Sequence, residues 1–501
     1  MAIKKTIDEK LKVKALFLNL EHEGPNPENA QDLDVNSAYE GPCRLGTGEQ
    51  LTHSFDQKSG AEKFKVFKKT LETYPDFVEF VNPQYTYWTD AFNYKHELYD
   101  ELKDELNECD LLVSEGVLNY YPTLQLAKKS GITSAAYGCC STDYPAGARL
   151  EGMEAYAYID HEDAKRHMGL LRAKKALKKT RVLYVLKDTV LPFGSQSNID
   201  PGVLNRGNPN LGVDVRFVNW QELLNVCENL TDEEKKIAND KAKELIANAK
   251  TCSMTEENVT KSCYLWVGVK RLLEKYGCNA FTMPCHEVCA TRAFNDRLQF
   301  TPCLCHSLLK EEGIPSACEL DLNALLSIDL LMNLTGSAPH MGNSGPFFLP
   351  DKLDFSVPNG LPIVPEVQGA ENIYYTFHAV QTRKMRGINE PMQEYQINSF
   401  THAGWGATIS HDFDEDRGEK ITMVRFSPDA KKMLVIRGEI VAGAGRDDIG
   451  CGIGFYWKCA DSRDAFEKQS DFGHHLTWVY GDYSKELKEI GKMLNVEVVL
   501  A

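Results

Sequence analysis

Short runs of apolar residues alternate with stretches of mixed polarity over the first two thirds of the chain. In the mixed stretches the apolar side chains recur every three or four residues, which predicts amphipathic helices. The short runs have the length of strands and lie at residues 13–20, 110–114, 132–137, 181–186 and 213–218. Strands that alternate with helices form parallel sheets, because a connection between parallel strands has to cross the sheet. The pattern therefore predicts an α/β fold for this part of the chain.

Local signals place the ends of two helices after residue 230. Thr231 and Glu234 have capping-box spacing ahead of a lysine- and alanine-rich helix that ends near Lys250. A second helix is expected over residues 259–276 and stops at Gly277, because glycine readily adopts the left-handed conformation that ends helices. We expect this region to continue the alternation of helices and strands.

The pattern changes at two places. Residues 166–181 are rich in arginine and lysine, and we interpret them as a solvated helix between two domains, although they also have the charge to bind a phosphate. From about residue 355, shorter segments such as 420–426 and 433–443 are typical of antiparallel strands. A chain of 501 residues fits about three domains. We predict α/β domains over 1–178 and 179–355, and a β-rich domain over 356–501.

Composition and charge disfavour several classes of protein. Hydrophobic residues make up 43% and charged residues 26% of the chain, which is ordinary for a globular protein. No run of about 18 apolar residues predicts a membrane span, and the N-terminus lacks the features of a secretion signal. The formal net charge of −16 disfavours binding to a phosphate backbone. We expect a cytoplasmic protein that binds neither membranes nor nucleic acids.

The chain has 15 cysteines, eight of them between Cys252 and Cys318, which raises the hypothesis of a metal cluster. Their spacing argues against it, because no two C-x-x-C pairs exist for a zinc or iron–sulfur site. Without a secretion signal we expect reduced thiols. We interpret the cysteines as small buried apolar residues.

Two acids lie between a short apolar run and a helical pattern in residues 310–348. Residues 314–318 are predicted to form a buried strand, Glu319 and Asp321 follow it, and leucines at helical spacing begin at Leu322. The acids should therefore occupy a strand-to-helix turn, where a helix N-terminus favours negative charge. They could be a site or simply cap the helix.

A second pair of polar residues follows the preceding strand. Residues 280–283 are predicted to form a strand, with His286 and Glu287 just beyond its end. Acids at the ends of adjacent parallel strands share one edge of the sheet, where carboxylates can bind a divalent cation and exchange protons with a substrate. Chance placement explains them equally well. No G-x-G-x-x-G follows the first two predicted strands, which disfavours a dinucleotide-binding oxidoreductase.

Two segments resemble the L-fucose isomerase and L-arabinose isomerase superfamily of metal-dependent aldose–ketose isomerases, and the L-fucose isomerase-like branch in particular. They are FGHHLTWVYGDYSKELKEIGKMLNVEVV at 472–499 and CELDLNALLSIDLLMNLTGSAPHMGNSGPFF at 318–348. The resemblance implies two consecutive Rossmann-like domains with parallel sheets, followed by an antiparallel β-rich domain. It also implies a homo-oligomer, a trimer or hexamer, in which a neighbouring chain's N-terminal domain completes the pocket.

The resemblance also implies roles for individual residues. Asp321 matches the second acid of the family's Glu-x-Asp and His475 matches its imidazole ligand, so we expect Glu287, Asp321 and His475 to bind the metal. Glu287 and Asp321 would be the catalytic carboxylates, and Glu319 and His286 would contact the substrate. Such an oxygen-rich site suits Mn²⁺ or Mg²⁺.

The expected reaction moves a proton between C1 and C2 of an unphosphorylated sugar through an enediol, with carboxylates as acid and base. The resemblance implies a pentose or 6-deoxyhexose similar to L-fucose, D-arabinose or L-arabinose. Phosphorylated sugars usually need a basic cradle, and Arg292 and Arg297 are the only arginines near these segments. A sugar-binding protein without catalysis is the alternative, because tandem α/β domains also form receptors that close around a ligand.

Overall fold

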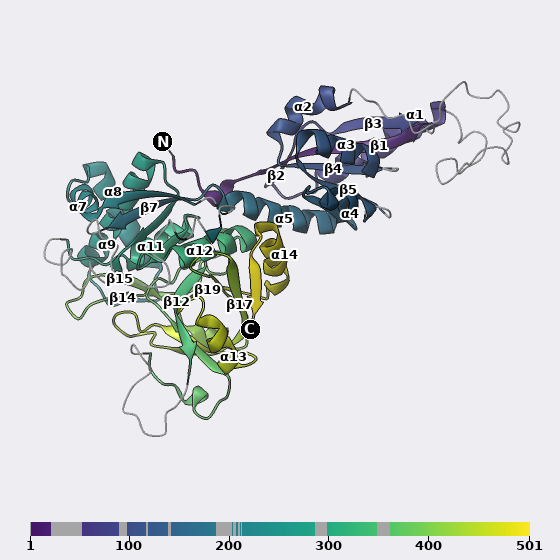
Figure 1. The fold of residues 1–501 in the computed structure, drawn as a ribbon. Coiled ribbons are helices and arrows are strands. Elements are labelled where there is room, and N and C mark those ends of the chain that lie inside the picture. Colours follow the sequence, from purple (N-terminus) through teal and green to yellow (C-terminus); the bar gives the residue numbers. More distant parts are fainter. Residues whose placement is uncertain are drawn as a thin grey trace, which may run out of the picture. The chain divides into compact units, whose positions relative to one another are not determined.

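A computed structural model describes residues 2–21, 53–89, 98–116, 119–138, 142–186, 203, 207–208, 211, 213–285, 298–347 and 361–501. The chain forms two compact units. One is Lys10–Arg172, and the other combines Met1–Glu9 with Ala173–Ala501. Both are drawn in Figure 1. The division into three domains at residues 178 and 355 stays a prediction.

The Lys10–Arg172 unit is built on a parallel sheet with the order β2-β1-β4-β5-β6, in which β3 also pairs with β1. The chain passes from β1 to β2 and β3 on one side, then to β4 on the other, so the carboxyl edge has a switch point between β1 and β4. The strands are β1 (Leu11–Glu21), β2 (Val78–Phe80), β3 (Gln84–Thr89), β4 (Leu111–Gly116), β5 (Thr133–Tyr137) and β6 (Ala155–Tyr158). The helices are α1 (His53–Leu71), α2 (Leu98–Glu108), α3 (Tyr120–Ser130), α4 (Asp143–Leu150) and α5 (His161–Leu177), the last of which crosses the unit boundary.

A second parallel sheet, with the order β11-β10-β7-β8, begins the other unit. Its strands are β7 (Arg181–Leu186), β8 (Asp214–Asn219), β10 (Ala280–Met283) and β11 (Ser316–Cys318). Its helices are α7 (Trp220–Glu228), α8 (Asp232–Asn248), α9 (Glu256–Tyr276), α11 (Cys303–Glu311) and α12 (Leu322–Thr335). The predicted capping box of Thr231 and Glu234 opens α8, and Gly277 ends α9 in a left-handed conformation.

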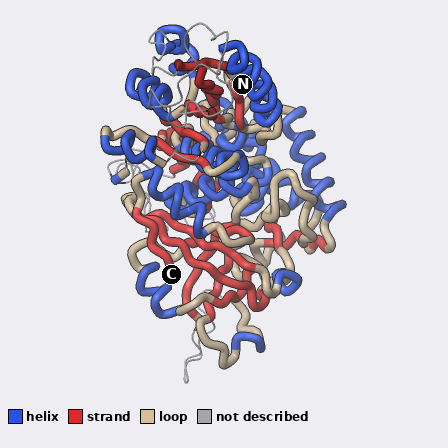
Figure 2. Tube along the Cα trace, turned by 90° about the vertical axis from the view of Figure 1, so that its right-hand side faces the viewer, coloured by secondary structure: helices blue, strands red, loops and turns tan. Residues whose placement is uncertain are grey.

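Six antiparallel strands then close into a barrel, because β16 at one end of the order β16-β19-β12-β13-β18-β17 also pairs with β17 at the other. Figure 2 shows these strands in red. They are β12 (His340–Pro346), β13 (Ile373–Phe377), β16 (Lys420–Phe426), β17 (Lys432–Ala444), β18 (Gly454–Lys458) and β19 (His475–Tyr480). The fold class is therefore as predicted, with parallel α/β sheets followed by an antiparallel β domain.

Smaller elements complete this unit. Strand β20 (Glu497–Leu500) pairs in parallel with β17, and β9 (Thr251–Cys252), β14 (Gln396–Ser399) and β15 (Ala407–Ser410) form a three-stranded sheet. The remaining helices are α13 (Ser462–Gln469), α14 (Ser484–Leu494) and the 3₁₀ turns Thr6–Asp8, Pro365–Val367 and Phe413–Asp416. No helix in the described part of the chain is long and apolar enough to cross a membrane.

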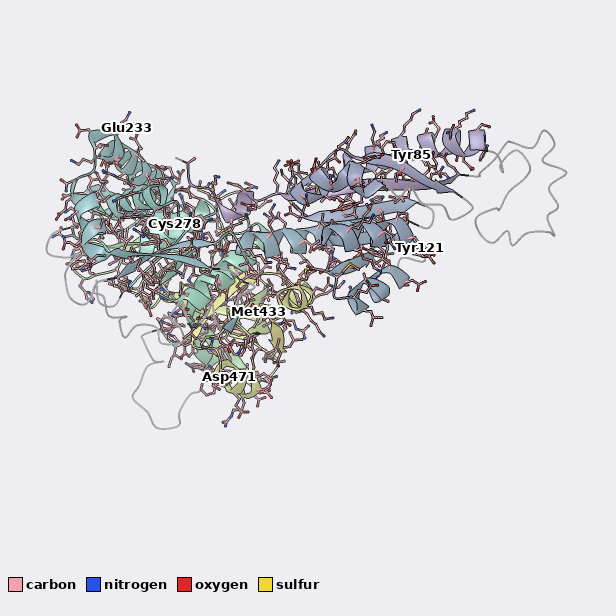
Figure 3. All side chains as sticks on the ribbon, turned by 45° about the horizontal axis from the view of Figure 1, so that its top comes forward. Tyr85, Tyr121, Glu233, Cys278, Met433 and Asp471 are labelled. Carbon is pink, nitrogen blue, oxygen red and sulfur yellow. The ribbon has the colours of Figure 1, made fainter. Side chains whose placement is uncertain are left out.

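Helix α12 lies between the second parallel sheet and the barrel. All of its residues from Leu322 to Asn333 are buried, and its polar Asp329 accepts hydrogen bonds from the hydroxyls of Thr6 and Thr180 inside the protein. It shares one hydrophobic core with sheet residues such as Ala280 and with barrel residues such as Val424 and Met433; Met433 is labelled in Figure 3. This packing fixes the turn before α12 against the barrel.

Candidate metal centre

The turn between β11 and α12 carries the two predicted acids. Glu319 and Leu320 both have positive φ, 59° and 58°, a left-handed conformation that is uncommon for residues other than glycine and is often found at functional sites. Asp321 follows as the N-cap of α12, and its Oδ1 accepts a hydrogen bond from Ala324 N at 2.9 Å. The capping interpretation is thus correct for Asp321.

Asp321 also joins this turn to the barrel through Arg425 and His475. Arg425 Nη2 lies 2.9 Å from Asp321 Oδ2 and 3.0 Å from Oδ1, and His475 Nδ1 lies 2.9 Å from Oδ2. All three side chains are fully buried. Burial raises the pKa of Asp321, but the charge of Arg425 and the hydrogen bond from His475 outweigh it and hold this pKa well below its usual range. Asp321 is therefore a carboxylate with both oxygens engaged.

This contact fixes the tautomer of His475. Because an ionised carboxylate only accepts hydrogen bonds, Nδ1 of His475 carries a proton, and Nε2 is the ring nitrogen that a metal ion could bind. Nε2 lies 3.6 Å from Glu319 Oε2, which is too long for a hydrogen bond. The Glu319 carboxylate and this ring nitrogen thus face each other in a buried place, at a distance that one shared cation can bridge.

Two further imidazoles lie beside Glu319. His378 Nε2 is 3.6 Å from Glu319 Oε1, and His474 packs against His475 with ring centroids 4.3 Å apart. Burial of its ring, then the neighbouring His475 and Arg425, lower the pKa of His474 to about 4, although the residue as a whole is exposed. His474 is therefore a neutral ligand candidate at neutral pH.

The ligand atoms form two groups of metal-binding size that share Glu319. One group is Glu319, His474 and His475, and the other is Cys318, Glu319 and His378; within each, the ligand atoms lie within 4.8 Å of one another. His378 is 1% exposed, and neither of its ring nitrogens has a hydrogen-bond partner among the described residues. A buried imidazole without such partners is costly unless something else binds it. The residues present therefore fit a divalent cation.

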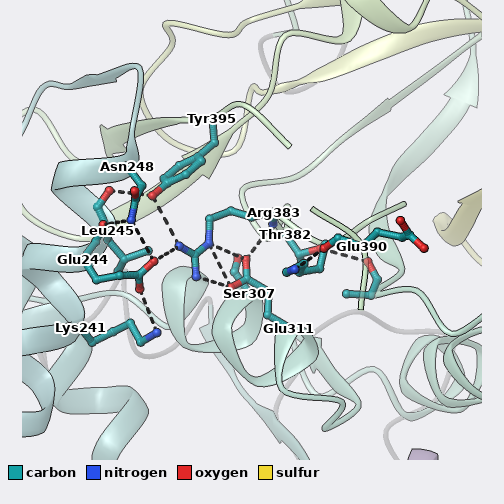
Figure 4. A network of polar contacts seen from close by, with 12 residues as sticks. Lys241, Glu244, Leu245, Asn248, Ser307, Glu311, Thr382, Arg383, Glu390 and Tyr395 are labelled. Atoms are coloured by element: carbon teal, nitrogen blue, oxygen red, sulfur yellow. Dashed lines mark hydrogen bonds and ion pairs between the residues drawn. The ribbon is translucent and has the colours of Figure 1, made fainter. Parts of the chain in front are cut away.

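The segment that carries His378 is anchored on α11. The buried Lys310 donates hydrogen bonds to Val380 O at 2.8 Å and to Pro339 O at 3.0 Å. Three residues further along, Arg383 forms ion pairs with Glu311 at 2.6 Å and with Glu244 at 2.7 Å, as Figure 4 shows. These contacts hold His378 in place at the end of β13.

Cysteine side chains lie on the His378 side of Glu319. Cys285, Cys303 and Cys318 are buried. The Cys318 thiol has its pKa raised well above the usual range by a hydrogen bond with Cys285 and by burial. The interpretation of the cysteines as small apolar residues did not anticipate that Cys318 contributes a sulfur to a group of ligand atoms.

The structure brings together some of the predicted site residues. Asp321, His475 and Glu319 are neighbours, whereas His286 and Glu287 lie outside the described residues, so the metal-binding trio of Glu287, Asp321 and His475 stays a prediction. Sequence reasoning did not select His378 as a site residue. It is a single histidine in a β-rich region without a spacing motif, and only the tertiary contact with Glu319 identifies it.

Comparison with known proteins supports an isomerase. No protein-family model matches the chain. Curated relatives include the sulfoquinovose isomerases of Priestia aryabhattai and Priestia megaterium, each 23% identical over 341 residues, which is 65% of this chain and 68% of the relative. The chain is thus distantly homologous to sulfoquinovose isomerase, and the L-fucose isomerase-like branch stays a prediction.

Proposed function

We propose that the protein is a metal-dependent aldose–ketose isomerase whose divalent cation is held by Glu319, His474 and His475. The observation that carries this proposal is the buried approach of Glu319 Oε2 to His475 Nε2 at 3.6 Å. The ligand atoms of these two residues and of His474 lie within 4.8 Å of one another, close enough to share one ion. The distant homology to an isomerase supports the same reaction class.

Asp321 has a positioning role in this proposal. Its contact with Nδ1 holds His475 in the tautomer that presents Nε2, and a carboxylate behind a ligand histidine commonly orients the ring and raises its basicity. Arg425 keeps that carboxylate ionised and also donates to His475 O at 2.7 Å. Because both oxygens of Asp321 are already engaged, we prefer this role to its predicted role as a direct ligand.

In this proposal the cation stabilises negative charge on the sugar oxygens, and side chains of the protein transfer the proton. A divalent cation, Mn²⁺ or Mg²⁺ in our proposal, would when bound lower the pKa of sugar hydroxyls and stabilise negative charge on their oxygens. The proton transfer between C1 and C2 needs a carboxylate base close to the substrate. Glu287 remains our candidate for that base, His286 for a substrate contact, and a homo-oligomer for the assembly.

Two substrate classes are supported by different observations. The sequence resemblance supports an unphosphorylated pentose or 6-deoxyhexose, and the homology to sulfoquinovose isomerase supports sulfoquinovose itself. The described ligand groups favour a neutral sugar, because the buried cation at the site, Arg425, is already paired with Asp321. A substrate panel has to contain both classes.

The test is incorporation of solvent deuterium into sugars by the metal-loaded protein. Pentoses, 6-deoxyhexoses and sulfoquinovose are incubated in D₂O with Mn²⁺, and the label at C1 or C2 is read by NMR. We expect label and ketose with at least one sugar, and loss of both after chelation or in Glu319→Gln. If no sugar in the panel gives label or ketose, the isomerase proposal is wrong. Sugar binding that survives chelation would then favour a binding protein.

A further inference from the structure

Glu319 presents its second oxygen to a group that differs chemically from the proposed catalytic one. Oε1 lies 3.6 Å from His378 Nε2, and Cys318 Sγ completes a group whose ligand atoms lie within 4.8 Å of one another. Cys318 is fully buried, Glu319 is 7% exposed and His378 is 1% exposed. The buried ring of His378 has no hydrogen-bond partner in the described part of the chain, which points to a ligand at this position.

We propose that Cys318, Glu319 and His378 bind a thiophilic divalent cation such as Zn²⁺. A thiolate, a carboxylate and an imidazole are the three ligand types that zinc takes in proteins, and three protein ligands leave one position of a tetrahedral ion open. Thiolate favours zinc, cobalt and cadmium over Mn²⁺ or Mg²⁺, which prefer oxygen ligands. On binding, the Cys318 thiol releases its proton to solvent and the sulfur bonds to the ion.

The environment of Cys318 agrees with a soft ion. Met341 Sδ lies 3.4 Å from Cys318 N, and Cys285 forms a hydrogen bond with the Cys318 thiol. The group on this side of Glu319 thus contains a thiol beside an imidazole, whereas the group on the other side contains imidazoles alone.

The shared Glu319 predicts that a second metal ion regulates the enzyme, a prediction that rests on the proposed function. Because Glu319 belongs to both groups, an ion bound to Cys318 and His378 draws on the charge of the carboxylate that also holds the catalytic ion, and it adds a second positive charge beside that ion. Zn²⁺ should therefore inhibit the Mn²⁺-supported reaction through Cys318. Reduced thiol is needed for this inhibition, since an oxidised sulfur is no ligand.

The binding is tested without any activity measurement, by titrating Co²⁺ into the full-length, reduced protein and recording sulfur-to-cobalt charge-transfer absorption in the near ultraviolet. We expect a band that saturates at one Co²⁺ per chain. Cys318→Ser should abolish it, and His378→Gln should weaken Co²⁺ affinity by about tenfold or more. Cys263→Ser is the matched control, because Cys263 is an equally buried thiol of α9, and it should leave the band unchanged.

The outcomes separate this inference from the proposed function. Absence of the band in the wild-type protein, or a band that survives in folded Cys318→Ser, overturns the soft-metal site, whatever the protein catalyses. If the band behaves as expected but no sugar is isomerised, the site stands and the proposed function fails. If both hold, Zn²⁺ should slow the Mn²⁺-supported deuterium exchange of the wild-type protein several-fold, and the same addition should slow Cys318→Ser much less relative to that variant's own rate without Zn²⁺; equal fractional inhibition in both proteins would overturn the competition for Glu319.

Discussion

Two carboxylate–imidazole clusters lie at carboxyl edges of parallel sheets, and they differ in burial and in the distances between carboxylate and imidazole. The Glu115 cluster consists of Glu115 at the end of β4 with His161, Tyr74 and Tyr137. His161 Nε2 is 3.2 Å from Glu115 Oε2 and its Nδ1 is 2.7 Å from the Tyr74 hydroxyl, which in turn lies 2.7 Å from that of Tyr137. Hydrogen bonds thus link Tyr137, Tyr74 and His161, and the ring of His161 lies close to the Glu115 carboxylate.

The Glu319 cluster consists of Cys318, Glu319, His378, His474 and His475. Here the carboxylate oxygens lie 3.6 Å from the two imidazole nitrogens that face them. The side chains of His378 and His475 are at most 1% exposed, whereas those of Glu115 and His161 are 33% and 25% exposed beside a cavity of about 600 Å³. Water can therefore solvate the first cluster, whereas in the second His474 alone is exposed.

The difference shows that residue types alone do not indicate a metal site. Both clusters have a carboxylate and a histidine, and the Glu115 cluster even lies at a switch point of its sheet, where ligands commonly bind. What distinguishes the Glu319 cluster is burial combined with distances too long for hydrogen bonds, a combination that an added cation would compensate. The predictions below follow from this contrast.

The largest expected effect is on stability, in Asp321→Asn. This change leaves the buried charge of Arg425 without its counterion, and breaking such a buried pair costs roughly 3–5 kcal/mol. Glu115→Gln, which breaks the partly exposed pair with His161, should cost about 1 kcal/mol or less. Urea denaturation of both variants measures the contrast, and equal losses would contradict it.

The second-largest expected effect is on catalytic rate and metal content, which should fall in a variant of the Glu319 cluster but not in a variant of the Glu115 cluster. Glu319→Gln removes the charge that both ligand groups share, so kcat should fall by about 10²-fold or more and bound Mn²⁺ should be lost. Glu115→Gln is the counterpart in the other cluster and should retain both. The measurements are the initial rate of ketose formation and the metal content after gel filtration. If Glu319→Gln retains its bound Mn²⁺, Glu319 is not a ligand of the metal centre.

Lys310, which anchors the segment that carries His378 of the Glu319 cluster, predicts a pH dependence of stability. Burial lowers the pKa of Lys310 to about 7, below its value near 10.4 in an unfolded chain. The unfolded state then binds more protons between about pH 7 and pH 10, so the free energy of unfolding that depends on Lys310 rises with pH over this range. Between these pH values the free energy of unfolding of the wild-type protein should rise by a few kcal/mol relative to that of Lys310→Met. If the difference between the two free energies does not change with pH, the pKa of Lys310 is not lowered by burial.

The smallest effect is expected in the hydrogen-bonded cluster. Tyr74→Phe removes the hydroxyl that links His161 to Tyr137 and should cost about 1 kcal/mol of stability. Because this cluster is partly exposed and lies in the Lys10–Arg172 unit, apart from the proposed metal ligands in sequence, the metal content and the isomerase rate should not change. Loss of either would mean that the Glu115 cluster takes part in the site.

The sequence predicts the fold well because the strands and helices have clear periodicity. The runs at 181–186, 280–283 and 420–426 coincide with β7, β10 and β16. The turn with Glu319 and Asp321 is also where the strand end and the leucine spacing place it. These features are local, so residue order suffices to find them.

The division of labour within the site could not be predicted. Asp321 and His475 are 154 positions apart, and their partners depend on the packing of α12 against the barrel. The roles of Glu319 and His378 follow from that packing too, since neither has a local pattern that sets it apart from a capping acid or a core histidine. The sequence therefore indicates which residue types gather at the site, but not which oxygen faces which nitrogen.

The most direct test of the account is a crystal of the protein grown with Mn²⁺ and measured at the manganese absorption edge. The account predicts one anomalous peak per chain beside Glu319, within bonding distance of His475 Nε2, and none between Glu115 and His161. A structure with full Mn²⁺ binding elsewhere, or with Glu319 and His475 unchanged and no peak between them, would contradict the central claim that the Glu319 cluster is a metal centre.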